Sequence, residues 1–164
     1  MMIQGSSEET HLKLLIERHL QKIFGLVIHL VWGNSNGAYD ITVSGFVEAL
    51  CLTLPFEKDE VFLAKLAGIA IEKCRNTKAI PSSEESDFID LPCHKKAALL
   101  ITKEVFYNLP FDDKALLLLR DQLHFAYRDI ANIFNSSESE VKIRITHIRI
   151  KLRDGIKEIL DHAQ

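Results

Sequence analysis

Apolar residues recur at intervals of three and four along most of the chain, the spacing of helices that bury one face. From His11 the pattern predicts a first helix, which the turn-forming residues 33–37 (GNSNG) end. A second helix is predicted across 40–53 and a third across 59–76. The apolar positions of the first helix share one face: Leu12, Ile16, Leu20, Ile23, Val27 and Val31.

The composition changes after the third predicted helix. The stretch 76–92 (NTKAIPSSEESDFIDLP) holds two prolines and four acids, which is typical of a linker. No strand-like alternation persists elsewhere, so the predicted class is all-α, with two small helical domains joined by a linker. The predicted division is a flexible tail at 1–10, a helical domain at 11–77, an acidic linker at 78–92 and a second helical domain at 93–164.

The second domain ends in a pattern typical of a helix-turn-helix. A short helix is predicted at 127–134, a turn at 135–137 and a long helix afterwards, preceded by a leucine-rich helix at 113–123. Ser137 and Glu140 have the spacing of a capping box, which satisfies backbone donors where a helix begins. The long helix carries one narrow apolar stripe: Val141, Ile145, Ile148 and Leu152.

Positively charged residues are concentrated on that last helix. The chain has 20 Lys and Arg against 23 Asp and Glu, a formal net charge of −3, which gives no overall attraction to nucleic acid. From Lys142 to Lys157, however, six cations accompany the single acid Asp154. Such a run of charged residues is commonly the solvent-exposed face of a helix in a helical bundle. Its coincidence with a short helix, a turn and a cap favours a helix in the major groove of DNA.

Residues typical of an enzyme or of a metal site are missing from the sequence. Three widely spaced cysteines and seven histidines form no trusted ligand spacing, and no phosphate-binding loop or nucleophile motif occurs. Asp112 and Asp113 are interpreted as a helix cap. We therefore expect no enzyme activity, cofactor or metal. The chain also shows no signal peptide or membrane segment, so a cytoplasmic protein without membrane insertion is expected.

Residues 109–153 resemble the fourth conserved region of bacterial RNA polymerase sigma factors of the extracytoplasmic-function group. The similarity rests on Leu109-Pro110, Leu119-Arg120, Tyr127, Asp129-Ile130-Ala131, Val141-Lys142, Arg144, His147-Ile148-Arg149 and Leu152-Arg153. Residues 15–50 resemble the second region more weakly, through the Gly33-Asn34 turn and through Ala38, Asp40, Ile41 and Phe46.

The resemblance implies a transcription initiation factor that binds core RNA polymerase and recognises promoter DNA through the helix-turn-helix, with an anti-sigma factor as a further partner. The free protein is expected to be a monomer. The DNA-binding residues that it implies are Tyr127, Ser139, Lys142, Ile143, Arg144, Thr146, His147, Arg149 and Arg153. The polymerase-binding residues that it implies are Asp40, Ile41, Phe46 and Glu48.

The sequence departs from the family pattern mainly in the first domain. Tyr39, Val43 and Ser44 stand where the family usually has an acid and a Gln-Glu pair, and Glu72 replaces a usual asparagine in the helix that opens the promoter. These changes leave an alternative open, a sigma-like protein that binds an anti-sigma factor or polymerase without melting DNA. A third hypothesis is a plain helix-turn-helix regulator whose N-terminal helices form a dimer.

Overall fold

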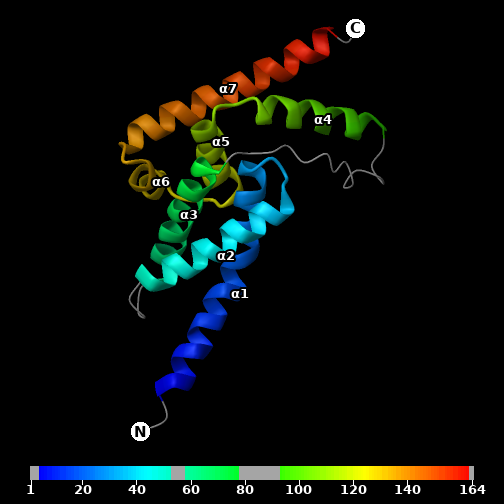
Figure 1. Cartoon of the computed structure of the whole chain (residues 1–164). Helices are drawn as coiled ribbons and strands as arrows, with labels where there is room; N and C mark the ends of the chain where they lie inside the picture. The colour runs from blue at the N-terminus through cyan, green and yellow to red at the C-terminus, as the bar shows by residue number, and fades with distance from the viewer. Residues whose placement is uncertain (1–3, 53–57, 78–92, 163–164) are drawn as a thin grey trace. The chain divides into compact units, whose positions relative to one another are not determined.

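The computed structural model describes residues 4–52, 58–77 and 93–162, and every element in these ranges is a helix (Figure 1). The predicted all-α class is therefore confirmed. The chain divides into two compact units, Met1–Pro81 and Ser82–Gln164. The linker predicted at 78–92 lies outside the described residues.

Unit 1 consists of α1 (Gln4–Leu30), α2 (Ser35–Leu52) and α3 (Asp59–Asn76), each in contact with the other two. The bounds of α3 match those predicted from the sequence. The helices pack because each places a row of apolar side chains inward. Fully buried residues at the centre include Ile23, Leu26, Val27, Phe62 and Leu66.

Two helices of unit 1 begin earlier than the pattern predicts. α1 begins at Gln4, within the segment 1–10 that we expected to be a flexible tail. α2 begins at Ser35 rather than Asp40, because the Asn34 side chain caps it: the backbone N–H of Gly37 donates to Asn34 Oδ1 at 3.0 Å. The reversal of the chain is thus confined to Trp32 and Gly33, which have positive φ.

A buried histidine joins α1 to α3. His19 is 3% exposed, and its Nε2 lies 2.9 Å from Asp59 Oδ1 at the start of α3. The hydrogen bond from His19, with the nearby charges of His19 and Arg18, holds the pKa of Asp59 below its ordinary value. This contact fixes the N-terminal end of α3 against α1.

The two described cysteines of unit 1 differ in environment. Cys51, near the end of α2, is exposed, whereas Cys74, in the last turn of α3, is 3% exposed. Desolvation raises the pKa of the Cys74 thiol to about 12. Cys74 therefore packs as a small apolar side chain.

Unit 2 consists of α4 (Cys93–Tyr107), α5 (Phe111–Leu117), the π-helical turn η2 (Leu118–Gln122), α6 (Tyr127–Phe134) and α7 (Glu138–His162). α7 contacts α4, α5 and α6, so it is the helix around which the unit packs. The buried side chains around it include Leu116, Leu119, Ile130, Ile145 and Ile148. Among the described helices, none is long and apolar enough to cross a bilayer.

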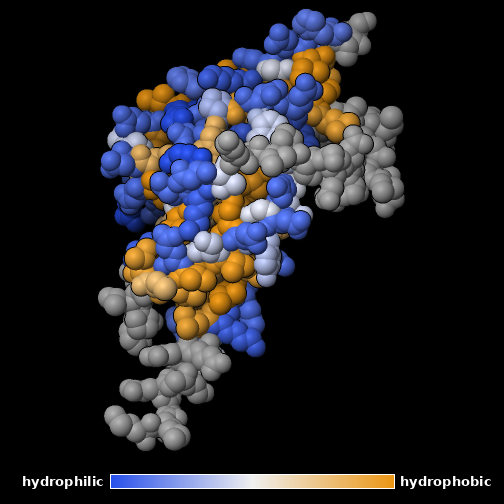
Figure 2. Space-filling view, in the orientation of Figure 1, coloured by the Kyte–Doolittle hydropathy of each residue, from blue (hydrophilic) through white to orange (hydrophobic). Residues whose placement is uncertain are grey.

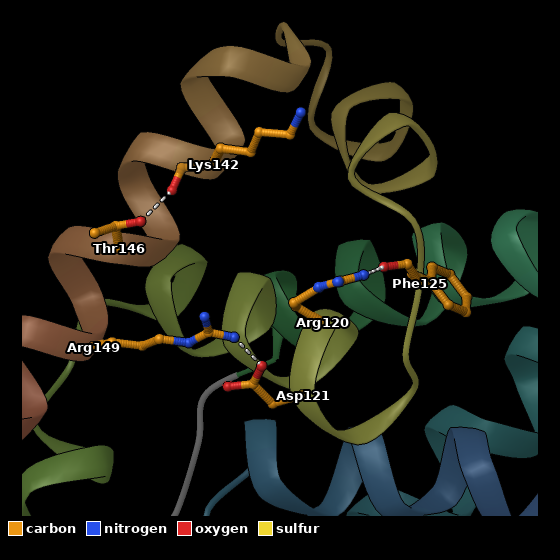
Figure 3. Close-up of polar contacts among 6 residues, drawn as sticks. All are labelled: Arg120, Asp121, Phe125, Lys142, Thr146 and Arg149. Atoms are coloured by element: carbon orange, nitrogen blue, oxygen red, sulfur yellow. Dashed lines mark hydrogen bonds and ion pairs between the residues drawn. The ribbon is translucent and has the colours of Figure 1, made fainter.

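The leucine-rich helix predicted at 113–123 is shorter than expected. It loses its α-helical spacing at Leu118, where the backbone N–H of Leu123 donates to the Leu118 carbonyl at 3.0 Å, five residues back. The N–H of Phe125 reaches the carbonyl of Leu119, also at 3.0 Å. This wide turn buries both Leu118 and Leu119 while Arg120 and Asp121 project toward α6 and α7 (Figure 3).

Candidate nucleic-acid interface

The turn between α6 and α7 has the geometry of a left-handed helix cap. Asn135 has φ 51°, a conformation that asparagine tolerates better than most residues. The N–H of Ser136 donates to the Ala131 carbonyl at 2.9 Å, and the N–H of Asn135 to the Asn132 carbonyl at 3.4 Å. This pair of bonds is the Schellman arrangement, which satisfies the last carbonyls of α6 and ends the helix abruptly.

The capping box predicted at the start of α7 is confirmed. The N–H of Glu140 donates to Ser137 Oγ at 3.2 Å, and the N–H of Ser137 donates back to Glu140 Oε2 at 2.8 Å. The Ser137 hydroxyl also lies 2.8 Å from Glu140 Oε2. The two bonds from Ser137 hold the pKa of Glu140 below its ordinary value. The cap therefore fixes the position where α7 begins relative to α6.

The apolar stripe of α7 packs as the sequence predicts. Val141, Ile145 and Ile148 are at most 2% exposed, and Leu152 is half-buried. Small Ala131 on α6 is also buried, so the two helices approach closely. The opposite side of α7 is left to solvent. The predicted helix-turn-helix is thus present, with its second helix exposed along one side.

Two arginines of α7 are held by acids from the preceding elements. Arg144 Nε donates to Asp113 Oδ1 at 2.8 Å, and Asp113 is 6% exposed. Arg149 Nη2 donates to Asp121 Oδ1 at 2.5 Å (Figure 3). The bond to Asp121 raises the pKa of Arg149. Asp113 is therefore no helix cap, which corrects the interpretation from sequence: Pro110 stands at the cap position of α5.

Two further cations are paired within α7 itself. Lys142 Nζ lies 3.6 Å from Glu138 Oε2, and Arg153 Nη2 lies 2.9 Å from Asp154 Oδ1. Over its whole length, 138–162, α7 carries six Lys and Arg against five acids, a net charge of +1. Among the side chains that the structure describes, only Lys151 and Lys157 of the six have no ion pair. The cationic surface is consequently weaker than the count over 142–157 suggests.

Tyr127, the first residue of α6, has two of the cations near its ring. The Arg120 guanidinium carbon lies 4.3 Å from the ring centroid and the Lys142 Nζ 5.3 Å from it. Arg120 is oriented by a 2.7 Å bond from Nη1 to the Phe125 carbonyl. This Tyr127 cluster connects η2, α6 and α7, and it draws the Lys142 side chain toward α6 (Figure 3).

The remaining predicted DNA-binding residues lie on the exposed side of α7. Ile143 is 58% exposed. The Thr146 hydroxyl donates to the Lys142 carbonyl at 2.9 Å within the helix. Ser139 and His147 are exposed. The structure therefore brings the predicted set together on α7 and at the start of α6.

The residues predicted to bind polymerase separate into two groups. Asp40 and Glu48 are exposed on α2, and Glu48 Oε2 lies 2.7 Å from Lys73 Nζ. Ile41 and Phe46 are 9% and 5% exposed and belong to the core of unit 1. Because these side chains are buried, they hold α2 in place within unit 1. Their role as polymerase-contact residues stays a prediction.

Apolar side chains form a row on the exposed side of α2, beside Asp40 and Glu48. Tyr39, Val43 and Val47 recur every four residues and are 62%, 40% and 59% exposed. We call these three residues the α2 row. Figure 2 shows apolar residues gathered over α2, whereas the surface over α7 is mainly hydrophilic and is interrupted by smaller apolar patches. The sequence already contained this signal, because Tyr39 stands where the family usually has an acid and Val43 where it usually has a glutamine.

Sequence reasoning did not predict that Asp113 and Asp121 pair with arginines of α7 or that Arg120 lies over the Tyr127 ring. Nothing in local spacing points to them, because the ion pairs join residues 31 and 28 positions apart. No group of His, Cys, Asp and Glu side chains that could hold a metal occurs within the described residues.

Two curated proteins are similar to the chain along nearly its full length. The ECF RNA polymerase sigma-E factor of Haemophilus influenzae is 23% identical over 90% of this chain and 88% of its own. The RNA polymerase sigma-H factor of Pseudomonas aeruginosa is 25% identical over 92% of this chain and 88% of its own. No family model matches the chain. The similarity covers both units, as the resemblance found in the sequence does.

Proposed function

Because the chain is a divergent relative of the extracytoplasmic-function sigma factors, we propose that it is a transcription initiation factor that binds core RNA polymerase through unit 1 and recognises promoter DNA through unit 2. It acts in the cytoplasm and is monomeric when free. The factor performs no covalent chemistry itself. An anti-sigma factor is a further partner, competing for the same surfaces.

The observation that supports DNA recognition most strongly is the junction of α6 and α7. A Schellman turn and a capping box set the angle between two helices, and the second of them has a polar, solvent-exposed side. An α-helix of about 10–12 Å diameter fits the major groove, which is about 12 Å wide. The cations at the edges of this side, Lys142, Arg149 and Arg153, are about half to three-quarters exposed despite their ion pairs.

Polymerase binding is supported by the α2 row and the acids beside it. An exposed apolar row of this kind is typical of a surface that a protein partner covers. Asp40 and Glu48 at its edges would set the orientation of the partner by charge. The apolar character of the row suits a contact that is less dependent on salt than one built from charges alone.

The first experiment is co-purification of the full chain with core RNA polymerase. Val47→Asp places a charge at the C-terminal end of the α2 row and is expected to abolish the complex, and Asp40→Ala is expected to weaken it. The matched control is Val61→Asp, which changes a 42% exposed valine at the start of α3. Loss of the complex in both Val→Asp variants, or in neither, contradicts the assignment of this surface.

The second experiment is transcription by the purified complex from a library of genomic DNA fragments. Initiation at a defined set of sites is expected. A stable complex that binds such sites yet never opens the duplex would instead favour the sigma-like protein without promoter melting. Absence of any complex with polymerase would contradict the proposal altogether.

A further inference from the structure

The exposed side of α7 carries an apolar row through its middle. Ile143 and Ile150 are 58% and 41% exposed and lie seven residues apart, on the same side of the helix. Thr146 lies between them, and its hydroxyl is occupied by the Lys142 carbonyl at 2.9 Å. The hydroxyl proton is thus used within the helix, and the Thr146 methyl offers an apolar surface for an outside contact. Each of the three positions therefore presents an apolar group.

The cations next to this row are directed away from it. Arg144 is held by Asp113 of α5, and Arg149 is held by Asp121 of η2. Lys142 is drawn toward the Tyr127 ring. These charges are placed for phosphates at the edges of a groove rather than for base edges at its centre. In the second and third turns of α7, the apolar groups between these cations are Ile143 and the Thr146 methyl, with the exposed His147 beside them.

The major groove offers one apolar group to such a surface, the C5-methyl of thymine. Building on the proposed function, we propose that Ile143, assisted by the methyl of Thr146, recognises thymine C5-methyl groups in the promoter element read by α7. The row is not assigned to a protein partner, because cations border it and because the capped end of α7 is the part that a helix-turn-helix inserts into the groove.

Ile150 provides a matched comparison within the same helix. It is the same residue type on the same side, but it lies about 10 Å further along at about 1.5 Å per residue. Base edges are read by the N-terminal residues of the recognition helix. Ile150 is therefore expected to lie beyond the bases, and its truncation tests for a general loss of apolar surface.

The experiment begins with the full chain in complex with core RNA polymerase and a random-sequence DNA duplex made with thymine. The enriched duplex is then remade with deoxyuridine at single thymine positions, a change that removes only the C5-methyl. At one or two of the thymine positions, the substitution is expected to weaken binding by the wild-type complex about fourfold. This is the factor that corresponds to the burial of one methyl group. Ile143→Ala is expected to bind both duplexes equally, whereas Ile150→Ala keeps the wild-type ratio.

Each contrary result has a distinct meaning. Equal binding of both duplexes by the wild-type complex, or an unchanged ratio in Ile143→Ala, overturns the assignment while sequence-specific binding still stands. Loss of polymerase affinity in Ile143→Ala with an unchanged ratio places the row against protein and overturns it as well. If no sequence is enriched, the proposed function itself fails. Circular dichroism and thermal unfolding of each variant verify the fold, which an exposed Ile→Ala change should preserve.

Discussion

At the scale of residues, the two acids that hold arginines of α7 differ in burial. The Asp113 side chain is 8% exposed, so a change at Arg144 leaves a buried carboxylate without its charged donor, at a cost of about 1–3 kcal/mol. The Asp121 side chain is 46% exposed, so water can replace Arg149 there. Breaking the Arg144 contact is therefore expected to cost more stability than breaking the Arg149 contact.

Asp121→Asn is expected to strengthen non-specific DNA binding. The change releases Arg149, and one more phosphate contact makes the slope of log affinity against log salt steeper by about 0.9. The measurement is a titration of the full chain with a fixed duplex at several salt concentrations. Asp161→Asn, in the last turn of α7, makes the same change in net charge away from this contact. Equal slopes in the two variants would show that Asp121 does not restrain Arg149.

The capping box predicts a pH dependence of stability. The folded pKa of Glu140 is lowered by the two bonds from Ser137, so its contribution is complete above the ordinary glutamate value and is lost as the pH falls through the folded value. Glu140→Gln keeps a side-chain acceptor but removes the titration. The wild-type chain is expected to be the more stable at pH 7, and thermal unfolding should show this advantage disappearing as the pH falls below the ordinary glutamate pKa. A constant difference would contradict the role of the charge.

The capping box could be predicted from sequence because its two residues lie three positions apart and both act on the backbone. The ion pairs that hold Arg144 and Arg149 could not be predicted from sequence. Counting charges over 142–157 excludes the acids at 113 and 121, which reach α7 only through tertiary packing. The resemblance to the family also pointed to Ile41 and Phe46. It marked their helix as important, but it could not indicate which side of that helix is buried.

At the scale of elements, the contact between α4 and α7 depends on Gly155. A Cβ at this position would lie 2.9 Å from Val105 Cγ1 on α4, too close for two carbon atoms. Valine is stiff about its χ1 angle and cannot move aside without leaving its preferred rotamer. The glycine thus weakens the C-terminal half of α7 locally but allows α4 to approach it.

Gly155→Ala is therefore expected to destabilise the protein, although alanine normally stabilises a helix interior by about 1 kcal/mol relative to glycine. Overpacking costs about 1–3 kcal/mol, which outweighs that gain. Chemical denaturation of the single variant measures the loss, and the double variant Gly155→Ala with Val105→Ala should recover most of it. A single variant more stable than wild type would show that α4 and α7 can separate at no cost.

The elements whose ends were predicted well are those ended by local signals. α3 and α6 have the predicted bounds because acids begin α3 and Asn135 ends α6. The start of α2 was misplaced because GNSNG was interpreted as a turn throughout, whereas Asn34 acts as a cap. The π-helical turn at 118–122 has no periodic signature, since leucines fill the sequence on both sides of it.

At the scale of the whole molecule, each unit has its own buried core, with Phe62 and Leu66 in unit 1 and Leu119 and Ile148 in unit 2. We expect fragments 1–81 and 82–164 to fold separately, each with a cooperative thermal transition followed by circular dichroism. The fragment 82–164 should also keep the DNA preference of the full chain. A fragment without a cooperative transition would show that its core is completed by the other unit.

Because Cys74 is buried, the reactivity of its thiol can be used to measure local opening of unit 1. A thiol that is protonated and shielded in the folded state cannot react with alkylating reagents, because only an exposed thiolate is nucleophilic. Cys51 on the surface reacts first and serves as the reference. The labelling rate of Cys74 relative to Cys51 therefore measures how often α3 leaves its place, and a partner that clamps unit 1 should slow it.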